Sequence, residues 1–274
     1  MMETRAISVP GGSIWVSSTG APRKPAAIML HHGLAHSRMW APLMDSVSDE
    51  LFGIAYDCRC FGRSTTTSEG TYSDTDDLTS VFDAYGVDRA ILVGASRGAR
   101  IAIDFTLTHP DRVRGLFLLA PSISGFDMPI AEDERALFEA IERAEDASDI
   151  EAIITHESRL WVDGPTRAPA TERDDLRQRV AEMSRTNYAQ QRAEDTPDFT
   201  PMEPPAAGRL NEITCPVSVL VGEADTLGMR AMAATIEREC ASAMLTPVTD
   251  AAHMLALERP DIVESELRSW LRKH

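Results

Sequence analysis

The sequence lacks a long apolar run, and this absence limits where the protein can reside. No stretch approaches the roughly 18 consecutive apolar residues that a membrane-spanning helix needs. The first residues, Met1 to Ala6, lack the basic region and apolar core that mark a signal peptide. We therefore expect a cytoplasmic protein that does not bind membranes.

Positive charge is also scarce. The 27 Lys and Arg residues face 43 Asp and Glu residues, which gives a net charge of −16. Nucleic-acid binding needs a basic surface that matches the phosphates, so we expect no nucleic-acid partner. The acidic residues are spread along the chain and concentrate in 131–157, a pattern typical of a solvated surface.

Cysteine is rare, with four residues scattered along the chain. In a protein that is not exported, these are expected to be reduced thiols. Cys58 and Cys60 lie near the end of a predicted strand, but neither their spacing nor their neighbours indicate a metal site.

Short apolar runs alternate with longer amphipathic segments, which predicts an α/β fold with a largely parallel sheet covered by helices. A hairpin is expected at 7–9 and 13–16. The further strands are expected at 26–30, 52–56, 89–93, 113–119, 217–221 and 243–248, and the helices at 39–47, 72–85, 96–108, 228–240 and 261–272.

Residues 122–208 interrupt this alternation. They contain helical patterns at 131–145, 149–160 and 172–190 but no clear strand. The segment is too long for a loop. We interpret it as a helical cap over the carboxyl ends of the strands, where open parallel sheets bind ligands. Residues 1–121 and 209–274 then form the core domain.

The pattern Gly-Ala-Ser-Arg-Gly at 94–98 directly follows a predicted strand and precedes a predicted helix. In this setting Gly-x-Ser-x-Gly forms a tight turn that lifts the serine hydroxyl above the sheet. The glycines are needed because larger side chains there would collide with the strand and the helix. Ser96 is therefore the predicted nucleophile.

A serine hydroxyl needs a base and an orienting carboxylate to react at neutral pH. Asp225 follows the predicted strand 217–221, and His253 follows the last strand. The chain order serine, acid, histidine predicts a catalytic triad of Ser96, Asp225 and His253. Asp225 taken alone also fits a helix N-cap, and Asp127 is the alternative acid. Asp250 is interpreted as structural.

An oxyanion also needs donors, and His-His-Gly-Leu at 31–34 follows a buried strand. The backbone amides of Leu34 and Arg97 are the predicted oxyanion hole, with Arg97 at a helix N-terminus. His32 is expected to brace this loop by hydrogen bonding. The absence of nearby acidic ligands disfavours a metal site formed by His31, His32 and His36.

Together these motifs resemble the α/β-hydrolase superfamily, in its branch of small capped hydrolases. The resemblance implies an eight-stranded sheet, a Ser–His–Asp triad, and neither cofactor nor metal. The stretches that carry it are His32-Gly33, the turn at 57–64, the serine turn, the acid turn at 222–225, the loop at 252–253 and the structural His-Pro-Asp-Arg-Val at 109–113.

Two residues depart from the family pattern. Cys60 replaces a glycine that is usual in the 57–64 turn, which makes the geometry of that turn uncertain. Arg97 stands where an apolar residue is common. We favour an internal ion pair for Arg97, with Asp57 or Asp104 as partner, and the alternative is binding of an anionic substrate.

The substrate pocket is the least defined part of the site. In a cap of this kind, aromatic and apolar side chains are expected to surround a bulky apolar substrate, although Trp161 fits equally well as an anchor of a cap helix. The candidates for the pocket are His32, Phe126, Met128, His156, Trp161 and Met254.

The leading hypothesis is hydrolysis of a small ester or lactone through an acyl-enzyme. Carbon–carbon bond hydrolysis of a vinylogous diketone and a perhydrolase side activity are the alternatives within enzymes. Epoxide and haloalkane hydrolysis are disfavoured, because those relatives use an aspartate where this chain has Ser96. A silent ligand-binding protein is the non-enzyme alternative. The expected partner is a small-molecule substrate, and both a monomer and a homodimer remain open.

Overall fold

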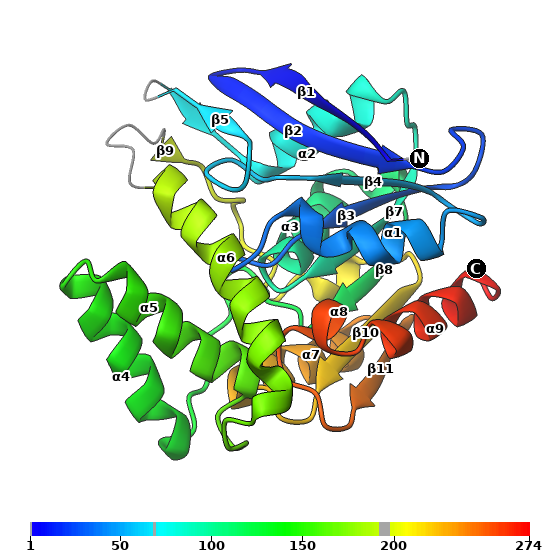
Figure 1. Ribbon diagram of the computed structural model, residues 1–274. Helices are drawn as coiled ribbons and strands as arrows, with labels where there is room; N and C mark the ends of the chain where they lie inside the picture. Colours follow the sequence, from blue (N-terminus) through cyan, green and yellow to red (C-terminus); the bar gives the residue numbers. More distant parts are fainter. Residues whose placement is uncertain (1, 68–69, 192–197) are drawn as a thin grey trace.

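The computed structural model describes residues 2–67, 70–191 and 198–274, and a twisted mixed sheet forms its centre (Figure 1). Among these residues eight strands follow one another across the sheet, and the short β5 (Thr65–Thr66) pairs with β2 beside them. The hairpin of the first two strands is antiparallel, and β2 is also antiparallel to β4. All later neighbours are parallel. The strand order is β1 (Glu3–Val9), β2 (Gly12–Thr19), β4 (Phe52–Tyr56), β3 (Ala26–Leu30), β7 (Ala90–Ala95), β8 (Val113–Leu119), β10 (Val217–Gly222) and β11 (Ala243–Val248). The predicted α/β fold with an eight-stranded, mostly parallel sheet is confirmed.

The central strands are buried along their whole length, which explains their continuous apolar runs. β3, β4, β7 and β10 have no exposed position. Parallel strands have continuous apolar sequences because helices cover both faces of the sheet. Alternate residues then enter opposite layers of the core: Ile28 and Leu30 join one apolar cluster, and Ala27 and Met29 the other.

Helices cover both faces of this sheet. The helices α2 (Asp74–Ala84), α3 (Arg97–Thr108) and α7 (Leu227–Glu239) pack on the first face. The second face carries α1 (Ala41–Ser46), α8 (Leu255–Glu258) and α9 (Pro260–Leu271). Stacked rings of Phe82 and Phe105, with centroids 5.2 Å apart, join α2 to α3. The serine turn and the loops that carry Asp225 and His253 are therefore supported by closely packed helices and strands.

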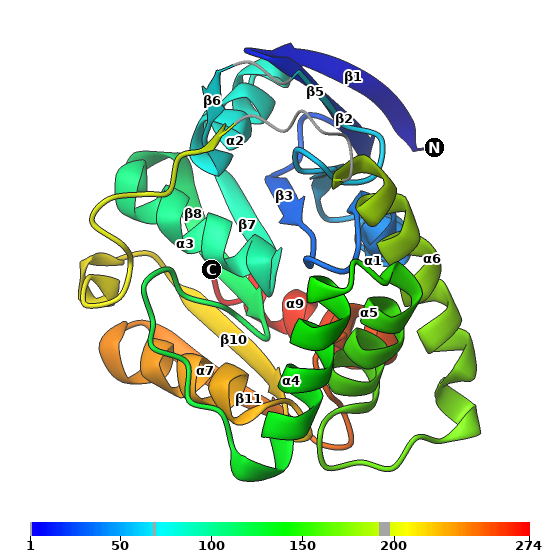
Figure 2. The ribbon, with the colours of Figure 1, turned by 90° about the vertical axis from the view of Figure 1, so that its left-hand side faces the viewer.

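The segment between β8 and β10 is helical where helices were predicted. It contains α4 (Glu132–Asp146), α5 (Ile150–Glu157), a π-helical turn (Ser158–Asp163) and α6 (Asp174–Gln191). Figures 1 and 2 show α4, α5 and α6 side by side. The two-residue strand β9 (Asp198–Phe199), which pairs with β6 (Thr71–Tyr72), was not predicted.

Hydrogen bonds connect these helices to the carboxyl-end edge of the sheet. The Ser184 hydroxyl of α6 donates to the Leu34 carbonyl after β3 (3.0 Å). The backbone amide of His253, after β11, donates to the Trp161 carbonyl (3.2 Å). The helical segment thus lies over the same edge at which the predicted catalytic residues emerge.

Candidate active site

Ser96 occupies the strained turn that the motif predicts. It follows β7 and precedes α3, and its backbone has φ 51° and ψ −113°. A Cβ on Gly94 would lie 2.6 Å from the Ala99 Cα, and one on Gly98 would lie 2.2 Å from the Leu30 carbonyl oxygen. Only glycine fits at either position, so the close approach of strand and helix fixes the serine above the sheet.

Asp225 and His253 are joined directly. The His253 Nδ1 lies 2.8 Å from the Asp225 Oδ2, and both side chains are buried. The second carboxylate oxygen of Asp225 accepts the amide of Thr226 (2.8 Å). The alternative acid, Asp127, is exposed. Asp225 therefore holds the histidine, with a carboxylate that is itself fixed by its own helix entry.

Ser96 and His253 both lie at the carboxyl-end edge of the sheet. The Ser96 amide donates to the Leu119 carbonyl at the end of β8 (2.9 Å). The His253 ring comes from the loop after β11 and contacts the His32 ring, which follows β3. β7, which leads into Ser96, lies between β3 and β8 in the sheet, so Ser96 and His32 follow neighbouring strands. Within the described residues no hydrogen bond joins the Ser96 Oγ to His253, and such bonds often tighten only when substrate is present.

Two backbone amides are available for an oxyanion. Across the described part of the chain, the amides of Leu34 and Arg97 donate to no other group. Arg97 is the first residue of α3, where the helix dipole favours negative charge. A Cβ on Gly33 would meet no atom within 4 Å, so the loop faces open space there. Backbone amides without an acceptor are the kind of donor that binds a tetrahedral oxyanion.

The brace of this loop is His31 and not His32, which corrects the sequence-based expectation. The His31 Nδ1 lies 2.6 Å from the His32 carbonyl oxygen, and its Nε2 accepts the Cys58 amide (3.0 Å). Burial lowers the pKa of His31 to about 4, so the ring is neutral and suited to both contacts. The His32 ring has no hydrogen-bond partner among the described residues.

The expected ion pair of Arg97 exists, but its predicted partners were wrong. Arg97 binds Asp74 of α2 at 2.8 Å, and Arg100 binds the other oxygen of Asp74 at 2.6 Å. Burial raises the pKa of Asp74, but the two guanidinium groups outweigh it and hold the pKa below its usual value. The Arg97 guanidinium also lies over the Phe61 ring, 4.9 Å from its centroid. These contacts fix the Arg97 side chain between Asp74 and the Phe61 ring.

Asp57, one of the predicted partners, is occupied elsewhere. Its two carboxylate oxygens accept the amides of Ser37 (2.8 Å) and Arg63 (2.7 Å). The other, Asp104, binds Arg100 at 3.2 Å. Each carboxylate near the serine turn therefore has its own partner.

Cys60 adopts the backbone conformation of the glycine that it replaces. Its φ is 65°, in the left-handed region that L-residues rarely adopt. Gly62, two residues on, has φ 55°, and a Cβ there would lie 2.1 Å from the Asp57 Oδ2. The turn at 57–64 thus keeps its shape with a cysteine at one strained position.

Trp161 is one of the pocket candidates that contact His253. Its ring centroid lies 4.6 Å from that of His253, and Phe138 of α4 packs edge-on against it at 6.0 Å. A cavity of about 690 Å³ adjoins Trp161 on the helical segment. It is lined by Ile130, Arg135, Phe138, Glu139, Ile141, Glu142, Glu145, Glu157 and Trp161.

The other pocket candidates lie in different surroundings. Phe126 packs against the first apolar cluster, and Met128 touches Gly228 at the start of α7. His156 is half-buried on α5. Met254 is fully buried in the second apolar cluster. The described ring contacts bring only His32 and Trp161 among the candidates against His253.

Phe138 and Glu157 were not predicted for this region. Burial raises the pKa of Glu157 to about 7, against the opposing effect of a hydrogen bond from the Tyr188 hydroxyl (3.0 Å). The only sequence signal was that both lie in amphipathic helices. Such a pattern does not tell which polar residue turns toward a cavity.

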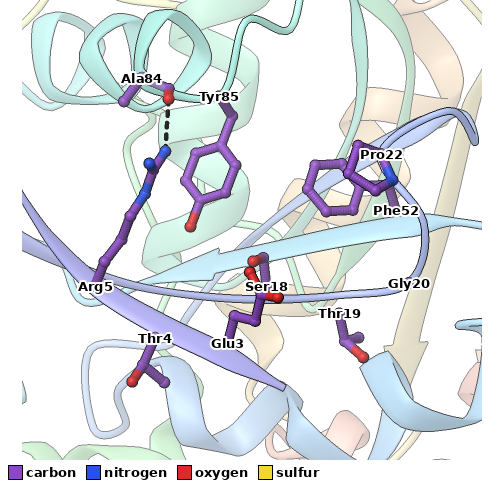
Figure 3. Close-up of a pocket in the computed structure, with 10 residues that line it drawn as sticks. All are labelled: Glu3, Thr4, Arg5, Ser18, Thr19, Gly20, Pro22, Phe52, Ala84 and Tyr85. Atoms are coloured by element: carbon purple, nitrogen blue, oxygen red, sulfur yellow. Dashed lines mark hydrogen bonds between the residues drawn. The ribbon is translucent and has the colours of Figure 1, made fainter. Parts of the chain in front are cut away.

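A second cavity, of about 360 Å³, lies far from these residues (Figure 3). It is bordered by β1, β2 and the end of α2, where Arg5 lies over the Tyr85 ring at 4.1 Å and donates to the Ala84 carbonyl (2.5 Å). Phe52, at the amino end of β4, also lines it. The cavity is therefore at the edge of the sheet opposite to Ser96.

Two absences among the described residues concern other kinds of site. No three His, Cys, Asp or Glu side chains in them are grouped so that they could hold a metal ion. Nor does any helix in these ranges have both the length and the apolar character needed to cross a bilayer.

Solved structures share the whole architecture. An esterase, RhEst1, from Rhodococcus sp. ECU1013 aligns with a TM-score of 0.78 at 21% identity, covering 99% of this chain and 98% of that one. The enol-lactonase from Burkholderia xenovorans LB400 aligns with a TM-score of 0.77 at 19% identity, covering 98% and 100%. At these identities the likeness shows the fold.

Sequence comparison extends this result to a family. An epoxide hydrolase from Caballeronia sordidicola is 28% identical over 172 residues, which are 60% of this chain and 50% of that protein. The chain spans half or less of the length of the curated relatives that it matches. A model described as "Alpha/beta hydrolase family" matches residues 28–266. This chain belongs to the alpha/beta hydrolase family.

Proposed function

We propose that this protein is a serine hydrolase that cleaves a small carboxylic ester or lactone. The observation that carries the proposal is the 2.8 Å contact between Asp225 and His253, at the sheet edge where the strained turn holds Ser96. Residues 122–208 act as the cap, and Trp161 forms its contact with the catalytic histidine.

The reaction follows from the position of each group. The Nε2 of His253 takes the proton of the Ser96 hydroxyl while the oxygen attacks the acyl carbon, and Asp225 stabilises the imidazolium that forms. The amides of Leu34 and Arg97 bind the tetrahedral oxyanion. His253 then gives its proton to the leaving alcohol oxygen. Water, activated by the same imidazole, hydrolyses the acyl-enzyme and restores Ser96.

The nucleophile decides against epoxide opening, although one relative is named an epoxide hydrolase. Opening an epoxide through a covalent intermediate that water can hydrolyse needs a carboxylate nucleophile, because attack by a serine would leave a stable ether. Ser96 stands at the turn in this chain. Acyl transfer is the chemistry that suits a hydroxyl between two free backbone amides.

The test is the turnover of p-nitrophenyl acetate and butyrate by the wild type and by Ser96→Ala. We expect the variant to lose activity by about 10⁴-fold or more. Ser122→Ala is the matched control, since the Ser122 hydroxyl donates to the Ser96 carbonyl (3.0 Å) and is not the nucleophile. It should retain at least a tenth of the activity.

A fluorophosphonate probe checks the same assignment without a chosen substrate. The wild type should become labelled on Ser96, and the Ser96→Ala variant should not. Full activity in Ser96→Ala, or labelling elsewhere, would disprove the triad. A folded wild type that neither turns over esters nor becomes labelled would point to a ligand-binding protein.

A further inference from the structure

Two further cavities, of about 180 Å³ and 320 Å³, lie where α6 meets the chain after β3. Both are lined by His36, Arg38 and Thr186, so they form one groove, here called the His36 groove. Arg38 belongs to the turn Ser37–Trp40, and Thr186 lies on α6. Neither Ser96 nor His253 lines either cavity. The groove is therefore separate from the proposed catalytic residues.

The smaller cavity carries two arginines that lack a partner. Arg38 and Arg179 both line it, and within the described ranges neither guanidinium group forms an ion pair or a hydrogen bond. Among the described lining residues the only carboxylate is Glu182, which accepts a hydrogen bond from Gln178 (3.2 Å). In a chain with a net charge of −16, this excess of positive charge favours an anion in the cavity.

His36 adds a third donor to the two arginines. Its side chain is only 8% exposed, and its Nδ1 lies 3.9 Å from the Asp57 Oδ1, which is too far for a hydrogen bond. The Nδ1 is fully buried and has no partner among the described residues. The Nε2 also makes no hydrogen bond to them, and it keeps accessible surface in the groove that the ring lines. A ligand can therefore reach the Nε2.

The His36 ring is neutral. Burial lowers its pKa, against the opposing effect of Asp57. A neutral imidazole carries one N–H donor, and with its proton on the Nε2 the ring donates into the groove. The groove thus presents a neutral donor beside two permanent cations.

The number and kind of these donors select the anion. The three terminal oxygens of a phosphate monoester match three donor groups, whereas a carboxylate has two oxygens. Guanidinium groups also pair with phosphate through two parallel hydrogen bonds. The larger cavity continues from the same residues and is lined by Trp15, over whose ring Arg63 lies at 5.1 Å. It gives room for the organic part of such a ligand.

We propose that the His36 groove binds a phosphate monoester, with the phosphate at Arg38 and Arg179 and the organic part beside Trp15. The His36 N–H donates to the remaining phosphate oxygen. This proposal does not rest on the chemistry of Ser96, because the groove contains none of the proposed triad.

Calorimetric titration of the wild type with inorganic phosphate and with phenyl phosphate tests the groove. Both anions should bind saturably. Phenyl phosphate should have a Kd about fivefold lower, since its ring buries apolar surface in the larger cavity. Absence of saturable binding would overturn the proposal. Equal affinity for the two anions would overturn the place given to the organic part.

Substitution of the two arginines locates the bound phosphate. Arg38→Gln and Arg179→Gln should each raise the Kd about tenfold or more, because each loses a charged donor to the phosphate. Both side chains are exposed, so the variants should fold. Arg230→Gln is the matched control, since this arginine is exposed on α7 and its side chain has no described partner. An unchanged Kd in the two groove variants would place the anion elsewhere and disprove the site.

Thermal stability separates binding from the screening of charges. Phosphate at about 100 times its Kd should raise the Tm of the wild type by about 5 °C. In the double variant Arg38→Gln, Arg179→Gln it should have no more effect than sodium chloride of equal ionic strength. A wild type stabilised equally by the two salts would contradict a specific site.

The two proposals fail in different ways. Ser96→Ala should bind phosphate with the Kd of the wild type. A wild type that binds phosphate at these arginines but neither hydrolyses esters nor becomes labelled contradicts only the proposed function. A wild type that is active but binds no phosphate contradicts only the His36 groove.

Discussion

The two sides of Ser96 differ in the kind of buried contact that they contain. On the α2 side, buried carboxylates meet guanidinium groups: Asp74 binds two arginines, and Arg59 binds Asp77 through two hydrogen bonds of 2.8 Å. On the His253 side, aromatic rings pack together and the His32 nitrogens have no partner in the described residues.

We expect this difference to separate substitutions that affect stability from substitutions that affect the reaction. Removing one partner of a buried ion pair leaves the other charge buried without compensation. Substitutions on the α2 side should therefore lower the stability of the fold. The side on which aromatic rings surround the proposed catalytic imidazole should respond in rate or selectivity. The substitutions below test that division, and the expected effects decrease in size.

The largest effect is expected on the His253 side. Asp225→Asn should lower kcat by about 10⁴-fold, because an amide cannot hold the histidine tautomer that accepts the serine proton. Ester turnover and circular dichroism measure rate and folding separately. The exposed Asp127→Asn is the control and should leave kcat unchanged. A comparable loss in Asp127→Asn would instead assign it the role of the acid.

On the α2 side, Asp74→Asn should lower the free energy of unfolding by about 4 kcal/mol, because it leaves two guanidinium groups facing a neutral amide. Urea denaturation measures the loss. Asp83→Asn breaks the more exposed pair with Arg112, where the N–O distance is 3.2 Å, and should cost about 0.5 kcal/mol or less. Equal effects of the two substitutions would contradict the division.

The pH dependence of stability tests His31, between the two sides. Its folded pKa of about 4 is below the unfolded value of 6.5, so below pH 6.5 the unfolded chain takes up a proton that the native ring refuses. The neutral His31 ring therefore contributes to the free energy of unfolding in full above pH 6.5. This contribution is lost as the pH falls toward 4, by up to about 3 kcal/mol. Urea denaturation from pH 7 to pH 4.5 should therefore give a shallower decline for His31→Gln than for the wild type. His274→Gln, at the exposed end of the chain, should decline as the wild type does.

The smallest effect is expected at Trp161. Trp161→Leu should lower kcat/KM for p-nitrophenyl butyrate about tenfold, since it removes the ring that packs on His253. Phe138→Leu is the comparison, because this ring contacts Trp161 without a described contact to His253. This substitution should lower kcat/KM about threefold or less. A larger loss of kcat/KM for Phe138→Leu than for Trp161→Leu would mean that the ring lining the cavity matters more than the ring that contacts His253.

Sequence patterns predicted the parts of the site that backbone geometry dictates. Ser96 follows from glycines that a strand–turn–helix crossing requires, and Asp225 and His253 follow from their places after parallel strands. The partner of Arg97 was missed because Asp74 is 23 residues away on α2. No pattern in the sequence tells which of the several acidic residues on that helix turns inward.

The bracing role was assigned to His32 and that of His31 was missed, for a related reason. Consecutive residues at a strand end point to opposite faces of the sheet, so only one of the two can brace the loop. Composition and spacing do not distinguish them. The short α8, β5, β6 and β9 were missed because segments of two to four residues are too short to show a periodic pattern.

Helix α6 has a consequence for how the site assembles. Its Asn187 accepts the Gly62 amide (3.1 Å) and donates to the Ala35 carbonyl (3.0 Å), while Ser184 holds the Leu34 carbonyl. Helix α6 is thus bonded to the loop that carries the Leu34 amide. Any outward movement of α6 would have to break these hydrogen bonds, so the position of this helix and the shape of the loop are coupled.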